Sequence, residues 1–350
     1  MNFSNIFRPL PVALLLAAFC LGPAARLAAQ STASDTVHVW DEKGETQTRI
    51  RGTIQAYDRN VLTILTVSGR EQQVPSDRVA RLDSRWDRRQ LDGDMAFASG
   101  EFERADQLYR QALDGEREIR SWVRHRLVVQ LVWCQRATGK WPEAGSLFLK
   151  SVLGSNPQTP YFDAIPLAWK TPAASLPMQR LAKNWLVDER SRTANLLGAS
   201  WLLTSTEREL AIEVLRQLTV GEDRQIAFLA ETQLWRIQVP TASEVTIREW
   251  EKLLSRMPTA FRAGPYHLLG HALKRTGRSQ DGLIAWMRVP LQYPRHRLLA
   301  AESLLVTARH YQSVGKRAQA TTLCRELMSG YSTTIAGQAA QDLLQELTDK

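Results

Sequence analysis

The stretch YHLLGHALKRTGRSQDGLIAWMRVPLQYP, from Tyr266 to Pro294, decides the fold because it predicts two short helices packed against each other. Its first half is apolar or small along one helical face, at Tyr266, Leu269, Gly270 and Leu273. Gly277 stands where a helix favours a left-handed terminal residue, and a second helical pattern follows, at Leu283, Trp286 and Val289. Pro294 ends the pair. The stretch therefore predicts a unit that offers an interaction surface and no active site.

The same plan recurs at four glycines, which are Gly100, Gly139, Gly277 and Gly315. The second of these follows the first by 39 residues, and the fourth follows the third by 38. The order of small, aromatic and proline positions resembles the tetratricopeptide repeat (TPR), a helix-turn-helix unit with a period of about 34 residues. The closest match to its second helix is Gly100-Glu-Phe102-Glu-Arg-Ala105, followed by Tyr109, Ala112 and Leu113.

This resemblance implies a mainly α fold, a right-handed α-solenoid of TPR-like helix pairs. Residues 85–154 would hold the first two repeats, residues 178–333 degenerate and regular repeats, and residues 334–350 a C-terminal capping helix. We expect the four glycine bends to line up along one ribbon. The helices carry tryptophans that most simply form the core, with an aromatic ligand cage as the alternative reading; they are Trp122, Trp133, Trp141, Trp185, Trp201, Trp235, Trp250 and Trp286.

Residues 155–177 interrupt the helical pattern with five prolines, which are excluded from helix interiors. Apolar residues in the same segment argue against a flexible linker, and they are Tyr161, Phe162, Ile165, Leu167 and Trp169. We therefore expect an excursion between two blocks of repeats. Two roles stay open for it, since it could plug the groove or brace the turn.

In the TPR family the first helix of each pair lines a concave groove. The resemblance places seven residues on that line, namely His267, His271, Lys274, Arg309, Gln312, Trp133 and Arg136. It implies a groove that receives an extended peptide or a partner helix, and the basic groups favour acidic ligand ends. Simple exposure to solvent is the alternative for each of these residues.

His267 and His271 are four residues apart on one predicted helix, the spacing with which two imidazoles can share a zinc ion. Leu268 stands where the general base of a His-Glu-x-x-His motif would be, so we expect neither metal binding nor metalloprotease chemistry. The chain has no Gly-x-Ser-x-Gly elbow, phosphate-binding loop or paired-cysteine zinc motif. The sequence thus predicts a protein without cofactors that is not an enzyme. Besides a protein-binding and a polymer-binding function, an enzyme of unrecognised type is a third possible class of function.

Residues 1–29 have the layout of a secretory signal peptide, because Arg8 precedes an apolar run and small residues follow it. The run, Leu10 to Leu21, is shorter than the roughly 20 residues of a spanning helix, which disfavours a membrane anchor. We therefore expect export to a periplasmic or extracellular location. The formal net charge is +9, and in an exported protein it favours anionic lipid, acidic polysaccharide or an acidic protein over nucleic acid. Charge spread over solvated faces is the alternative.

Residues 35–84 have the pattern of short strands separated by tight turns. The segment from Gly52 to Asp58, with Leu62 and Val79, resembles SH3-like and Sm-like small barrels. The resemblance implies a small β-barrel module, and the export signal argues against an Sm-type RNA site. A domain of this size has a thin core, so we expect it to pack on the first repeat.

Taken together, the patterns predict an exported, non-catalytic scaffold or adaptor. It would bind protein or peptide partners through the concave face of the helical array, in an envelope or extracellular assembly. The alternative is an accessory protein that binds an envelope polymer or polysaccharide with its N-terminal barrel.

Overall fold

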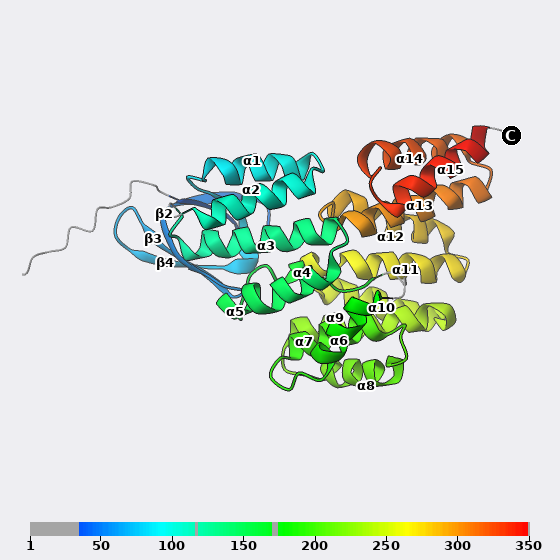
Figure 1. Cartoon of the computed structure of the whole chain (residues 1–350), viewed down its shortest axis with the longest axis horizontal. Coiled ribbons are helices and arrows are strands. Elements are labelled where there is room, and N and C mark those ends of the chain that lie inside the picture. The colour runs from blue at the N-terminus through cyan, green and yellow to red at the C-terminus, as the bar shows by residue number, and fades with distance from the viewer. Residues whose placement is uncertain (1–34, 116–117, 170–173, 349–350) are drawn as a thin grey trace, which may run out of the picture.

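The computed structural model describes residues 35–115, 118–169 and 174–348. Over these residues the chain is mainly α-helical, with a small sheet beside its first helices (Figure 1). The expected signal peptide, residues 1–29, lies outside the described residues, as do the last two residues of the expected capping helix. No helix in the described part is both long enough and apolar enough to span a bilayer.

The sheet has five antiparallel strands in the order β4-β3-β2-β1-β5. The strands are β1 (Asp35–Trp40), β2 (Gln47–Tyr57), β3 (Val61–Thr66), β4 (Glu71–Pro75) and β5 (Val79–Asp83). Alternate residues fall on one buried face, which is the period of a half-buried strand, and they include Val37, Val39, Ile54, Leu62, Ile64 and Val74. No pairing among the described residues joins β4 to β5, so the sheet is open and the expected closed barrel is not confirmed.

The sheet shares one hydrophobic core with the first helices, as we expected for so small a module. Val37 and Ile64 belong to the same buried cluster as Tyr109 and Trp122. A buried carboxylate on the first strand, Asp35, lies 3.2 Å from Nη1 of Arg120, which precedes the third helix. The module is therefore fixed to the helices by both apolar burial and an ion pair.

The helices run in two blocks, one before and one after the Pro-rich segment. The first block holds α1 (Arg88–Ala98), α2 (Phe102–Asp114), α3 (Ser121–Ala137), α4 (Trp141–Leu147) and α5 (Leu153–Ser155), with a π-helical turn Phe148–Val152 before α5. The second holds α6 (Leu176–Leu186), α7 (Arg192–Leu202), α8 (Arg208–Thr219), α9 (Arg224–Gln238), α10 (Glu244–Arg256), α11 (Ala263–Arg275), α12 (Ser279–Gln292), α13 (Arg297–Ser313), α14 (Arg317–Gly330) and α15 (Ile335–Thr348). Helices mostly pack on their neighbours in sequence.

The four glycine bends have the backbone conformation that the sequence predicts. Gly100, Gly139, Gly277 and Gly315 have φ of 80°, 73°, 86° and 74°. This left-handed region is strained for residues with a β-carbon, so glycine is needed there. A β-carbon on Gly270 would collide with the indole of Trp286, which confirms that Gly270 allows α11 and α12 to approach closely.

Three four-residue patterns in the sequence predict helix starts, at Ser84–Asp87, Thr206–Glu209 and Thr241–Glu244, and the structure caps these helices differently. Asp87, and not Ser84, caps α1 by accepting a hydrogen bond from the Arg89 amide, 2.8 Å away. Ser243, within the predicted 241–244 cap, accepts from the Thr246 amide at α10. The capping box predicted over residues 206–209 is wrong, since the residue before α8 makes no side-chain cap. In each case a different side chain forms the cap, or none does, and the helix itself still forms.

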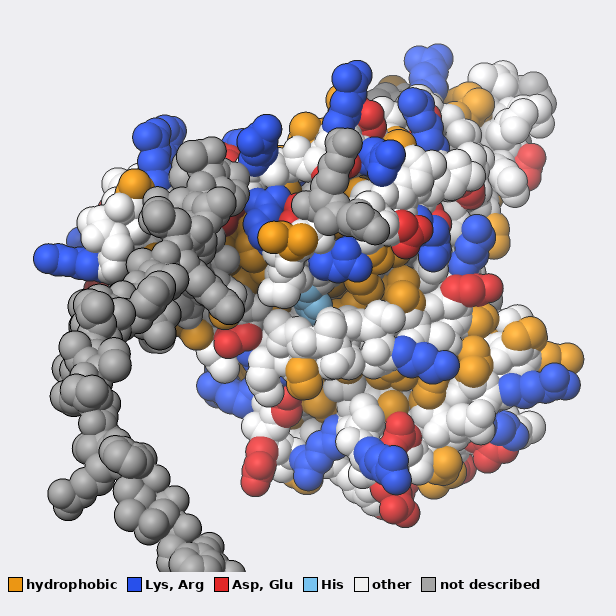
Figure 2. Space-filling view, turned by 60° about the vertical axis from the view of Figure 1, so that its left-hand side comes forward, with side chains coloured by type: hydrophobic (Ala, Val, Ile, Leu, Met, Phe, Trp, Pro, Cys, Tyr) orange, Lys and Arg blue, Asp and Glu red, His pale blue; other side chains and the backbone are white. Residues whose placement is uncertain are grey.

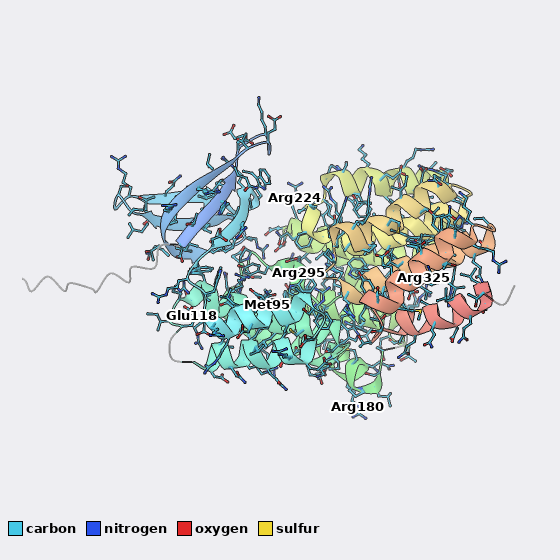
Figure 3. All side chains as sticks on the ribbon, turned by 90° about the horizontal axis from the view of Figure 1, so that it is seen from above. Met95, Glu118, Arg180, Arg224, Arg295 and Arg325 are labelled. Atoms are coloured by element: carbon cyan, nitrogen blue, oxygen red, sulfur yellow. The ribbon has the colours of Figure 1, made fainter. Side chains whose placement is uncertain are left out.

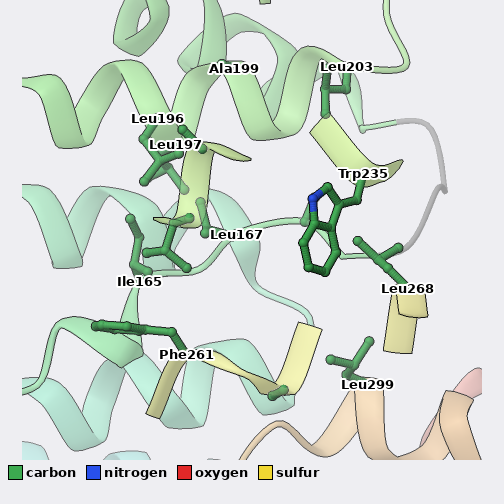
Figure 4. Close-up of a cluster of buried hydrophobic side chains, with 14 of the residues drawn as sticks. Ile165, Leu167, Leu196, Leu197, Ala199, Leu203, Trp235, Phe261, Leu268 and Leu299 are labelled. Carbon is green, nitrogen blue, oxygen red and sulfur yellow. The ribbon is translucent and has the colours of Figure 1, made fainter. Parts of the chain in front are cut away.

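The Pro-rich segment passes between the two blocks and is mostly buried. Its apolar residues belong to the largest hydrophobic cluster, together with residues of α3, α7, α9, α11 and α13. Figure 4 shows Ile165 and Leu167 among side chains from the second block, including Leu197, Trp235 and Leu268. The segment therefore lies in the interior between side chains of both blocks, a position that is compatible with both roles left open by the sequence.

The expected single ribbon of bends is wrong. A β-carbon on Gly100 would lie 3.7 Å from Nη1 of Arg297, at the first residue of α13. Gly315 follows the other end of that 17-residue helix, roughly 25 Å away at 1.5 Å per residue. The two blocks bury apolar surface on the same central segment, and this brings the first block against the start of α13.

Candidate functional site

His267 and His271, predicted on the groove, lie between helices. His267 is only 3% exposed, and its Nδ1 is 2.9 Å from Oγ of Ser303 on α13. Its Nε2 is 3.3 Å from Nε2 of His271, whose ring packs edge-on against Trp286. The described residues contain no group of three or more His, Cys, Asp and Glu side chains that could hold a metal ion. The imidazoles thus join α11 to α13.

Lys274 and Arg309 are exposed, as a contact surface requires. Lys274 lies in the last turn of α11, close to His310 on α13. Burial lowers the pKa of His310, and the positive charge of Lys274 lowers it further. Gln312 donates a hydrogen bond of 2.9 Å to the Glu346 carboxylate on α15. The last turns of α11 and α13 therefore each carry an exposed cation.

Trp133 and Arg136 are buried, 1% and 5% exposed, and do not face solvent. The guanidinium of Arg136 lies over the Trp133 ring at 4.0 Å and donates to the Asp163 carbonyl at 3.0 Å. Its Nη2 is 3.1 Å from Nδ1 of His296, the residue before α13. Burial lowers the pKa of Arg136 to about 9, against an opposing effect of the Asp163 charge.

α13 is the common neighbour of the predicted residues. Arg136 meets its start, His267 its middle and Lys274 its end. The structure therefore brings residues from distant parts of the sequence to one helix, but it leaves mainly the Lys274 end open to a partner.

No protein-family model, curated protein or solved structure matches this chain. Its candidate sites are accordingly argued from their own geometry.

A cavity of about 230 Å³ lies where the two blocks meet, at a place that the sequence analysis did not single out. Its walls come from the end of α3, the start of α4, the buried segment, α7, α13 and α15. The lining residues that matter are Arg136, Trp141, Leu167, Trp201, Arg295 and Arg297. The run Arg295-His296-Arg297 directly after Pro294 is a sequence signal that could have pointed to this place.

His296 sits at this cavity, and burial together with the charges of Arg136 and Arg295 holds its pKa well below the ordinary value. The folded state therefore favours neutral imidazole. Its contribution to stability is present above the unfolded-state pKa of about 6.5 and is lost as pH falls below it. We expect His296→Gln to flatten the fall in melting temperature between about pH 7 and pH 5, measured by circular dichroism. Plots of melting temperature against pH that run parallel for the variant and the wild type would contradict this role of His296.

The outer face of the sheet carries a row of basic residues. Arg81, His38 and Arg49 are direct cross-strand partners on β5, β1 and β2. Asp83 neutralises part of this row, because its carboxylate is 2.9 Å from His38 Nε2 and 2.7 Å from Arg81 Nε. Elsewhere, on the face in Figure 2, Lys and Arg side chains are spread among Asp and Glu, as the solvated-face alternative predicts.

Proposed function

We propose that this protein is an exported, non-catalytic scaffold that binds acidic protein or peptide partners in an envelope or extracellular assembly. We interpret its helices as TPR-like pairs of a right-handed α-solenoid. In this interpretation the helix pairs pack around residues 157–169. An SH3-like module precedes them. The signal-peptide pattern of residues 1–29 supports export.

The observation that carries the proposal is the recurrence of one helix-turn-helix construction. Each of the four bends has a left-handed glycine, and a small residue five positions after each glycine is buried in the second helix of the pair, at Ala105, Ala144, Gly282 and Ala320. Such units leave an apolar face open when alone and gain order by stacking, which yields extended surfaces for partners.

Within this array the proposed contact surface is the exposed end of the first helices at Lys274 and Arg309. The interior is filled by the chain's own Pro-rich segment, so a partner meets the array at its open edge. These two exposed cations, at the ends of α11 and α13, favour an acidic ligand and speed its association at low salt.

The test measures binding of a fluorescent Glu-rich decapeptide to the purified protein, with a Lys-rich decapeptide as the opposite probe. We expect the double variant Lys274→Glu, Arg309→Glu to bind the acidic peptide about tenfold more weakly, an effect that shrinks at high salt. Arg325→Glu on α14 is the matched control, because Arg325 is exposed and lies on the second helix of its pair (Figure 3). Equal binding by the double variant and the control would discard the Lys274 surface.

A second candidate is binding of an acidic envelope polymer or polysaccharide by the sheet module, favoured by the cross-strand row of Arg81, His38 and Arg49. Heparin binding by a sheet variant and by the Lys274 and Arg309 variant distinguishes the two candidate surfaces. If heparin, used as an anionic polysaccharide probe, loses affinity in Arg49→Ser, Arg81→Ser but not in the Lys274 and Arg309 variant, the sheet is the binding surface.

A further inference from the structure

We propose that the cavity between the two helix blocks binds a small apolar carboxylate, of the class of a medium-chain fatty acid. This site is separate from the exposed Lys274 and Arg309 surface, and it does not depend on the scaffold function. It follows from a cavity whose walls are apolar and whose charged groups are mostly cationic.

The walls of the cavity are apolar and aromatic. Trp141 and Trp201 lie with their ring centroids 5.2 Å apart, and the indole nitrogen of Trp201 donates to the Pro166 carbonyl, 2.9 Å away. Leu167 and Leu299 complete the surface together with Ala168. Because the Trp201 indole donor is already satisfied, this ring and the aliphatic side chains offer an alkyl chain van der Waals contact.

Three guanidinium groups line the same cavity, on Arg136, Arg295 and Arg297. None of them has a carboxylate of the described residues within ion-pair distance. Arg136 bonds to a carbonyl and an imidazole, and Arg297 lies over the rings of Phe102 and Tyr331. The Nε atoms of Arg136 and Arg297 are buried without a hydrogen-bond partner in the described structure. The cavity therefore contains cationic donors with spare capacity.

The acidic groups near the cavity are fewer. Glu302 lines it, and the charge of Asp163 acts on both Arg136 and Arg295 from behind the wall. Among the described residues, three cations against two acids leave a positive excess, and Arg forks match the planar carboxylate group. An anionic head with an apolar body satisfies both features, whereas an alkylammonium ion of the same shape would be repelled.

The volume limits the size of the ligand. About 230 Å³ is below the roughly 300–1,000 Å³ of pockets that take drug-sized molecules. A short alkyl chain fits this space, and a large ring system does not. Octanoate is therefore the probe, with octanol and octylammonium as neutral and cationic analogues of equal chain length.

The experiment is isothermal titration calorimetry of the purified full chain with each probe at neutral pH. We expect octanoate to bind and octanol to bind about tenfold more weakly, with no binding of octylammonium. Arg295→Gln should weaken octanoate about tenfold and leave octanol unchanged. Arg295, labelled in Figure 3, is exposed, so its replacement should not open the core. Arg325→Gln on α14 is the matched control and should bind octanoate like the wild type.

Two results would overturn the proposal. Equal affinity for octanoate and octanol in the wild type would mean that the guanidinium groups select nothing. Absence of octanoate binding by a wild-type protein with an intact melting transition would mean that the cavity takes no such ligand. A failure of the acidic decapeptide to bind would count against the scaffold surface and would leave the cavity proposal unaffected, since Lys274 and Arg309 are not part of this cavity.

Discussion

Replacing Phe162 by Ala should lower the free energy of unfolding by about 3–5 kcal/mol, as expected for truncation of a buried aromatic side chain. Phe162 is 2% exposed, and its ring meets Phe148 at 5.9 Å and Phe261 at 6.2 Å between centroids. The guanidinium of Arg59, in the turn between β2 and β3, lies over the same ring at 5.4 Å. One side chain thus joins the sheet module, the first block and the second block.

Urea denaturation followed by circular dichroism measures this change. Leu176→Ala is the control, because Leu176 is 69% exposed at the start of α6 and its removal should cost less than about 0.5 kcal/mol. If Phe162→Ala were as mild as the control, the central segment would not hold the blocks together. A second, earlier unfolding transition in the variant would show that the blocks separate before they unfold.

Ala105→Trp should destabilise the protein by about 3 kcal/mol or more through overpacking. Ala105 is fully buried in the cluster that joins α1, α2 and α3 to the sheet. The same cluster is tight elsewhere, since a β-carbon on Gly93 would lie 2.8 Å from the Tyr109 ring. There is no space for an indole, so the helices must move apart.

Thermal unfolding tests this prediction, and a drop in melting temperature of roughly 6–12 °C corresponds to that loss. Ala98→Trp introduces the same side chain at an exposed position of α1 and should leave the melting temperature nearly unchanged. An unchanged value for Ala105→Trp would remove the assignment of a TPR-like pair to α1 and α2.

Much of the local structure could be predicted because its causes are local. The pattern over residues 266–294 places apolar side chains on one face of each helix, and α11 and α12 form there. Gly277 adopts the left-handed conformation because the chain must turn within a few residues. Cys324, which falls on the apolar stripe of its helix, is fully buried. Six of the eight helical tryptophans are buried as well, and Trp141 and Trp185 are partly buried.

The candidate site could be predicted only in part. Periodicity tells which face of a helix is apolar, but His267 and Arg136 are polar and are buried by partners outside their own helices. Repeat alignment placed Arg136 on an exposed line because it assumes that only adjacent repeats touch, whereas His267 is covered by the next helix pair. The contact of Arg136 with His296 spans 160 residues, and that of Arg59 with Asp223 spans 164.

The sequence by itself determined the helix pairs, their glycine bends, the strand-rich start and the position of the Pro-rich break, since each depends on residues only a few positions apart. Tertiary structure alone decided that the sheet is open, that residues 157–169 are enclosed by both blocks, and that three arginines surround an apolar cavity. The physical reason is that burial of apolar area is not directional. Any apolar face can be covered by any other, and the pairing that results is fixed only when the whole chain packs.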